Sequence, residues 1–100
     1  MAEAQTSGQL EREMGIDHAD FRRLLPHALG QLRWRGGETR FSIAVGAGEV
    51  TIELGPERVR RIALLELPVT PVRFAWEGLA EGEFERFLER FDHYYRRGGG

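Results

Sequence analysis

Apolar and polar residues alternate with period two between Gln31 and Glu77, which is the spacing that places successive side chains on opposite faces of a β-strand. Residues typical of turns divide this stretch into five predicted strands. Large apolar side chains fall on one face of these strands, and most charged side chains fall on the other. The pattern therefore predicts an antiparallel five-stranded meander with one covered face and one open face.

The positions of the turns set the predicted register of the strands. Gly36 and Gly37 suit a two-residue hairpin turn, and further turns are expected at residues 55–58 and 68–71, where glycine and proline occur. In this register, Arg61 falls on the inner face. We therefore expect Arg61 to lie near a sheet end, to extend its guanidinium to solvent, or to be relieved by a β-bulge.

A helix is predicted before the strands. Asp17 is suited to cap its first turn, and apolar residues recur at helical spacing from Phe21 until Gly30 ends the pattern. Pro26 lacks the N–H that would bond the carbonyl one turn earlier. A kink or break near Leu25 is therefore expected.

A second helix is predicted after the strands, from about Leu79 to Arg97. Its glutamates gather near the start and its arginines near the end, as the helix dipole favours. The apolar stripe of this helix consists of Leu79, Phe84, Phe87, Leu88, Phe91 and Tyr95. Both helices need the inner face of the sheet. The predicted fold is therefore an α+β two-layer sandwich with an N-terminal and a C-terminal helix packed on one face.

The length of 100 residues is enough for one hydrophobic core and too short for two. We expect a single α+β domain over residues 17–97. Residues 1–16 lack sustained periodicity and residues 98–100 are glycines, so both segments are predicted to be flexible tails.

The chain gives no sign of membrane insertion or export. The longest apolar run within the predicted strands, at residues 62–65, is far shorter than the roughly 18 residues that a membrane span needs. The first residues lack the pattern of a signal peptide, and cysteine is absent. A cytoplasmic location is therefore expected.

All 14 basic side chains are arginines. Arginine is suited to planar, bidentate contacts with phosphate or carboxylate groups, but a codon bias towards arginine, glycine and alanine is the favoured explanation of this composition. The net charge of −2 is not the basic footprint of a nucleic-acid-binding protein. Nucleic acid is therefore not an expected partner.

Neither the histidines nor the serine of the predicted fold form a known catalytic pattern. The three histidines lack the spacing of metal ligands, and Ser42 is expected opposite Glu53, with no histidine nearby. We assign no catalytic residue, metal or cofactor. An enzyme is not expected, although catalysis is not excluded by these observations.

The open face carries the most informative candidates for a function. Ile62 and Leu64 are outward-facing apolar neighbours on one strand, with Ala75 nearby. The predicted border consists of charged residues and includes Arg40, Arg60 and Arg73. An apolar centre with a charged rim is typical of interfaces, although singly exposed apolar residues are also common. The first hypothesis is therefore a non-catalytic interaction or assembly module that binds a partner protein or forms a two-fold homodimer.

Two alternatives remain open. Trp34 and Trp76 fall at strand ends, where they belong to the core or, with His27, line a small-molecule cleft between the sheet and the first helix. The third hypothesis is an RNA or acidic-partner binder that uses the outer-face arginines. It is weakened because Arg35, Arg60 and Arg73 each have a predicted carboxylate opposite.

Overall fold

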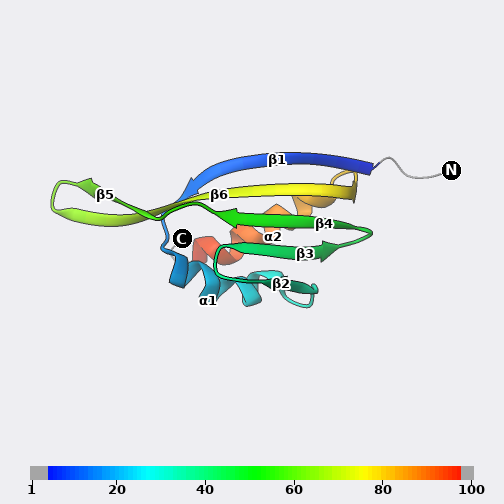
Figure 1. Cartoon of the computed structure of the whole chain (residues 1–100), viewed down its shortest axis with the longest axis horizontal. Helices are drawn as coiled ribbons and strands as arrows, with labels where there is room; N and C mark the ends of the chain where they lie inside the picture. Colours follow the sequence, from blue (N-terminus) through cyan, green and yellow to red (C-terminus); the bar gives the residue numbers. More distant parts are fainter. Residues whose placement is uncertain (1–4, 98–100) are drawn as a thin grey trace.

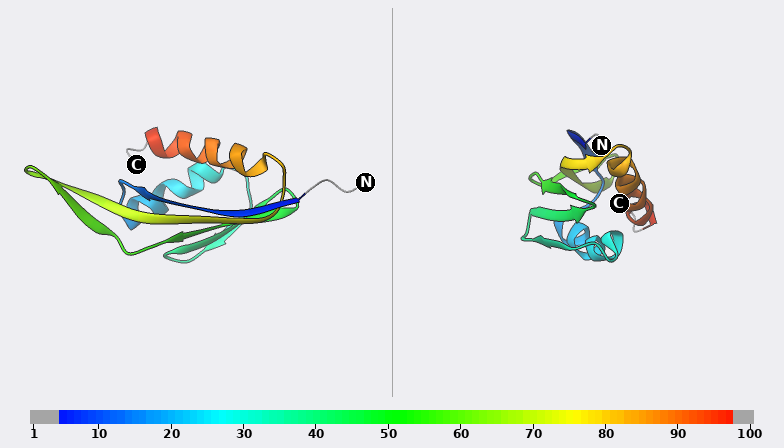
Figure 2. Two further views of the ribbon diagram at one scale, coloured as in Figure 1. Left: turned by 90° about the horizontal axis from the view of Figure 1, so that it is seen from above. Right: turned by 90° about the vertical axis from the view of Figure 1, so that its right-hand side faces the viewer.

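The computed structural model describes residues 5–97, which form an antiparallel sheet with two helices. The elements are β1 (Gln5–Met14), α1 (His18–Leu29), β2 (Trp34–Gly36), β3 (Arg40–Val45), β4 (Gly48–Leu54), β5 (Arg58–Ile62), β6 (Leu65–Ala80) and α2 (Glu83–Arg97). Figure 1 shows the sheet spread in front of the helices, and Figure 2 shows both helices on one side of it. The predicted α+β two-layer class is therefore confirmed.

The order of the strands differs from the predicted meander. The sheet has the order β1-β6-β4-β3-β2, and each neighbouring pair is antiparallel. β4 pairs with β6 and not with β5, which pairs only with residues 65–69 at the start of β6. The reason is the length of β6, which has 16 residues. Its first residues pair with β5, and its remaining residues run between β1 and β4.

The prediction of a flexible tail is wrong for residues 5–14, because they form β1, which pairs with β6 from Gln5 to Met14. Residues 1–4, and the predicted tail at 98–100, lie outside the described residues. The period-two signal of β1 is weak, because Gly8 and Arg12 occupy inward positions. Gly8 is required here, since a Cβ at this position would collide with the ring of Trp76.

The predicted turn at residues 68–71 is also wrong. Pro68 and Pro71 lie inside β6, and the chain reverses earlier, at residues 63–64, so that Ile62 faces Leu65. Proline is tolerated at sheet edges and irregular positions. Pro68 lies beyond the end of β1, and Pro71 lies beside the irregular link between β4 and β5.

The first hairpin has a wider loop than predicted. Gly36 faces Phe41, and the N–H of Gly37 donates to the carbonyl of Arg40 at 3.0 Å, so the two glycines do not form a two-residue turn. Arg61 keeps its inward position but lies near a sheet end, as one of the expectations stated. It is exposed on β5, where its Nη2 lies 3.4 Å from Oε1 of Glu66.

The ends of α1 agree with the prediction. Oδ1 of Asp17 accepts the N–H of Asp20 at 2.8 Å, and Gly30, with a φ of 60°, ends the helix. The expected break at Pro26 is wrong, because α1 runs through this residue to Leu29. Pro26 lies in the last turn, where the missing N–H costs one helical hydrogen bond.

α2 begins at Glu83, later than the predicted start at Leu79, because Leu79 and Ala80 complete β6. Oε1 of Glu83 accepts the N–H of Ala80 at 2.7 Å and thereby connects the end of the strand to the start of the helix.

Aromatic side chains from both layers form the centre of the core. Phe21 of α1 lies 5.0 Å from Tyr95 of α2, and the Tyr95 hydroxyl donates to the Phe21 carbonyl at 2.7 Å. Arg12 of β1 pairs with Asp92 of α2, and its guanidinium lies 5.2 Å from the centre of the Phe74 ring. These contacts connect β1 and both helices to the same core.

We predict that Phe87→Ala destabilises the fold by about 3–5 kcal/mol. Phe87 is 7% exposed, and its ring packs between those of Phe84 and Phe91 at 6.2 and 6.3 Å. Urea unfolding measures the change. A loss below about 1 kcal/mol would show that this side of α2 contributes little to the core.

A second prediction concerns Tyr95, whose burial raises its pKa above the ordinary value of 10.0. The unfolded chain loses the Tyr95 proton near pH 10, whereas the folded chain retains it. The contribution of the protonated Tyr95 to the free energy of unfolding is therefore complete below about pH 10. Above this pH the free energy of unfolding falls, by up to about 1.4 kcal/mol per pH unit.

Because the chain lacks lysine and cysteine, tyrosines are the side chains that titrate in this range. Urea unfolding at a series of alkaline pH values should show the decline in the wild type and not in Tyr95→Phe. Tyr94→Phe is the control, since Tyr94 is exposed. An equal decline in Tyr95→Phe would contradict the assignment.

Candidate functional site

A two-stranded hairpin projects from one end of the sheet, and we call it the arm. It consists of β5, the turn at residues 63–64, and residues 65–69 of β6. Figure 1 and Figure 2 show that the arm extends beyond both helices. The molecule measures 58 × 23 × 22 Å, and its radius of gyration of 14.5 Å exceeds the value of about 13 Å expected for a compact domain of this length.

The arm holds most of the exposed hydrophobic side chains of the described residues. Five of the seven large ones lie here: Val59 (59% exposed), Ile62 (53%), Leu64 (100%), Leu65 (61%) and Leu67 (41%). A contiguous group of exposed apolar side chains is characteristic of an interaction surface.

The register of the arm assigns these side chains to two faces, since opposed residues of an antiparallel pair share a face. The outer face, which continues the open face of the sheet, carries Arg58, Arg60, Ile62, Leu65 and Leu67. The inner face carries Val59, Arg61, Glu66 and Pro68. The half of the outer face nearest the tip is therefore apolar, and Leu64 extends it at the turn.

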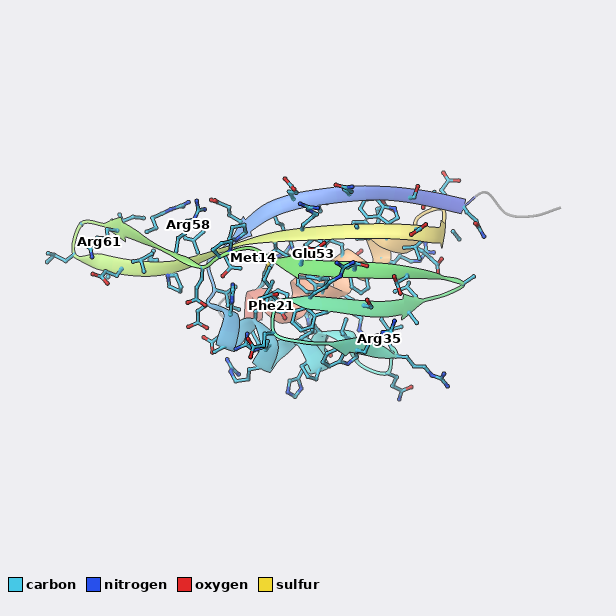
Figure 3. The ribbon with its side chains drawn as sticks, viewed as in Figure 1. Met14, Phe21, Arg35, Glu53, Arg58 and Arg61 are labelled. Atoms are coloured by element: carbon cyan, nitrogen blue, oxygen red, sulfur yellow. The ribbon has the colours of Figure 1, made fainter. Side chains whose placement is uncertain are left out.

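The charges of the arm are paired within the chain. The Glu13 carboxylate of β1 binds the guanidinium of Arg58, and its Oε1 lies 3.1 Å from Nη2 of Arg60. On the inner face, Arg61 pairs with Glu66. Figure 3 shows Arg58 near the root of the arm and Arg61 closer to its tip.

The link between β4 and β5 is attached to the start of α1. The N–H of Gly55 donates to the carbonyl of Pro71 at 2.8 Å. Nε2 of His18 lies 2.8 Å from the carbonyl of Gly55, and the backbone N–H of His18 donates to Oε1 of Glu57 at 3.1 Å. The carbonyl can only accept, so Nε2 carries the proton. These contacts hold the root of the arm against the body of the protein.

The six residues of the predicted interface do not form one patch. Arg60 and Ile62 lie on the arm and Leu64 at its tip, whereas Arg40 lies on β3, and Arg73 and Ala75 lie on the part of β6 within the sheet. The cause is that β5 pairs with the start of β6 and not with β4. Ile62 and Leu64 are therefore separated from Arg40, Arg73 and Ala75.

The open face of the sheet itself is polar. One row of opposed residues across β1, β6, β4 and β3 alternates in charge and consists of Glu11, Arg73, Glu53 and Arg40. Nε of Arg73 lies 3.3 Å from Oε1 of Glu11. The adjacent row consists of Gln9, Ala75, Thr51 and Ser42. The predicted apolar centre of this face is therefore wrong, and Ser42 faces Thr51 where Glu53 was expected.

A depression with a volume of about 410 Å³ lies on the open face at the root of the arm. Its lining residues include Glu13, Glu53, Gly55, Pro71 and Arg73. It is wide and open to solvent, so it does not enclose a ligand.

The three residues of the predicted cleft are not brought together. Trp34 lies on β2, Trp76 on β6 stacks on Phe84 at 3.7 Å, and His27 is exposed on α1. β3 and β4 separate the strands of the two tryptophans. Fully buried side chains such as Phe21 fill the space between α1 and the sheet. The geometry therefore gives no support to a small-molecule cleft at this place.

Among residues 5–97, no group of three or more histidine, aspartate and glutamate side chains is arranged to hold a metal ion. Neither described helix has the length and apolar character needed to cross a membrane.

Comparisons of the chain with protein-family models, with curated proteins and with solved structures find no match. A function is therefore inferred from the geometry and chemistry of the described side chains.

We predict that Glu13→Gln loosens the arm without destabilising the sheet. Exposed ion pairs contribute about 0.2–1 kcal/mol, so amide exchange in residues 58–62 should accelerate by up to about fivefold. Exchange in β3 and β4 should remain unchanged. Hydrogen exchange followed by NMR measures both, and Glu11→Gln is the matched control because Glu11 pairs with Arg73. Unchanged exchange in the arm would contradict the role of Glu13.

Proposed function

We propose that the protein is a non-catalytic assembly module that binds a second copy of itself through the arm. The observation that carries this proposal is the concentration of exposed apolar side chains on one projecting hairpin. An isolated two-stranded hairpin is at best marginally stable in water. Contact with another surface would stabilise the arm and remove its apolar side chains from solvent.

The distribution of charge favours an identical partner. Arg58 and Arg60 are bound by Glu13, and Arg61 is paired with Glu66. The apolar half of the outer face carries no charged side chain, so it needs no opposite charge on its partner, and two such halves can meet without bringing like charges together. A surface that is complementary to itself is suited to a two-fold homodimer.

The free edge of β5 favours packing of faces over addition of a strand. Three of its five residues are arginines, Arg58, Arg60 and Arg61. Charged edge strands disfavour pairing with another strand, and an antiparallel β5–β5 pair centred on Arg60 would place like charges opposite each other. We therefore expect Ile62, Leu64 and Leu65 to make the central contacts.

The size of the apolar surface sets the expected affinity. Full burial of each leucine or isoleucine side chain contributes about 1.5–3 kcal/mol, whereas association costs on the order of 4–15 kcal/mol. Three such residues from each copy then leave a net gain of a few kcal/mol, so the expected dissociation constant lies between about micromolar and millimolar. The expected dimer is therefore reversible.

The other two hypotheses draw less support. The space beneath α1 is filled, and the outer-face arginines Arg58, Arg60 and Arg73 are paired with carboxylates. The pairing leaves these arginines little capacity for RNA or an acidic partner.

We predict that Leu64→Glu lowers the association constant by at least about tenfold. Leu64 is fully exposed, so the thermal stability of the monomer should remain unchanged. Sedimentation velocity over a range of protein concentrations measures the association. Leu65→Glu should have the same effect, because Leu65 belongs to the same apolar surface.

Ala75→Glu is the matched control, since it places the same charge on the open face of the sheet and outside the arm. It should leave association unchanged. Dissociation of the dimer by Ala75→Glu, with Leu64→Glu still dimeric, would move the interface to the open face. A wild-type protein that remains monomeric up to millimolar concentration would contradict self-association altogether.

A further inference from the structure

Basic side chains form a row on the solvent-facing side of α2. Arg86, Arg90 and His93 follow one another at intervals of four and three residues and therefore lie on one face of the helix. Arg96 lies beside them, and all four side chains are exposed. We call these four residues the α2 basic row. With Glu89 they line a shallow hollow of about 490 Å³.

Among the described residues, the arginines of this row differ from those of the arm in their lack of ion pairs, which they share with Arg33, Arg35 and Arg40. Among residues 5–97, carboxylates pair with Arg12, Arg23, Arg58, Arg60, Arg61 and Arg73. Within the same range, no carboxylate lies within 4.0 Å of the guanidinium nitrogens of Arg86, Arg90 or Arg96. In a chain of net charge −2, this row groups three arginines without ion pairs in the described part of the chain, and Glu89 is the carboxylate that lines the same hollow.

Arg90 is positioned by the neighbouring helix. Its guanidinium lies over Gly30, in space that a Cβ at position 30 would occupy. Gly30 is the C-terminal cap of α1, and the free carbonyls at a helix C-terminus attract a cation. This contact with the end of α1 restricts the Arg90 side chain before any ligand binds, which lowers the entropic cost of binding.

The length of the row limits the kind of anion that it fits. From Arg86 to Arg96 the row spans about 15 Å, since a helix rises about 1.5 Å per residue. Glu81, Glu83 and Glu85 lie at its N-terminal end, and Glu89 lies within it. A long phosphate backbone would have to pass over these carboxylates. A short segment whose carboxylates are spaced apart can place them on the arginines and avoid the glutamates of α2.

We propose that the α2 basic row docks a short acidic segment of a partner protein, whose glutamate or aspartate side chains pair with Arg86 and Arg90. Figure 2 shows α2 in the helical layer, on the other side of the molecule from the open face of the sheet. This surface is separate from the arm, so the proposal does not depend on self-association. A dimer joined through the arms would carry one basic row in each copy.

The probe is a fluorescein-labelled hexaglutamate peptide, and fluorescence anisotropy of the full chain measures its binding at low and at physiological salt. The wild type should bind at low salt and lose affinity as salt rises, because the contacts are exposed ion pairs. Arg86→Gln with Arg90→Gln should weaken binding by at least about tenfold. Arg86→Lys with Arg90→Lys should recover part of the affinity, since the charge is kept and the planar fork is lost.

The matched control is Arg33→Gln with Arg35→Gln, which removes the same charge from exposed positions away from α2. It should change the affinity by less than about twofold. Equal weakening by both double variants would show that binding depends on net charge alone and would contradict a specific site. Absence of binding at low salt would also contradict the proposal. Tighter binding of a labelled hexauridylate RNA, also lost with Arg86→Gln and Arg90→Gln, would replace the acidic segment by nucleic acid.

Discussion

The pairing of β6 is the constraint on which the rest of the structure depends. Its 16 residues form one continuous strand, although Pro68 and Pro71 lie within it. Residues 65–69 pair with β5 beyond the end of β1, and this excess length creates the arm. The remaining residues run between β1 and β4, so the same strand also gives the N-terminal segment its place at the sheet edge.

The second determinant is the way in which a polar strand is held on an apolar core. β1 contributes Arg12 to its inner side, where a charge without a partner would be costly. Asp92 of α2 neutralises it, and the rings of Phe74 and Phe91 lie against the guanidinium at 5.2 and 5.7 Å. Arg12 thereby joins β1 to α2 across the core. Among the described residues, the arm is supported at its root by Glu13 and by the contacts of His18.

The arm and the α2 basic row are different kinds of surface. Charges on the arm are paired within the chain, so its remaining chemistry is apolar and suits a surface like itself. Arginines on the row have no ion-pair partner among the described residues, so their chemistry suits an anion. The two proposed roles, self-association through the arm and docking of an acidic segment on the row, therefore depend on different chemistry.

Within residues 17–97, the sequence by itself determined most of the side chains that face the core, because period two or 3.6 depends only on local spacing. Phe41, Ile52 and Phe74 are buried, Asp17 caps α1, and Ile62 and Leu64 are exposed, all as the pattern predicted. Tertiary structure decided which strands are neighbours, since alternation assigns a face and not a partner. Only the fold could reveal that the turn lies at Ala63, that Arg12 meets Asp92 across 80 residues, and that Leu65 and Leu67 share the exposed arm with Ile62.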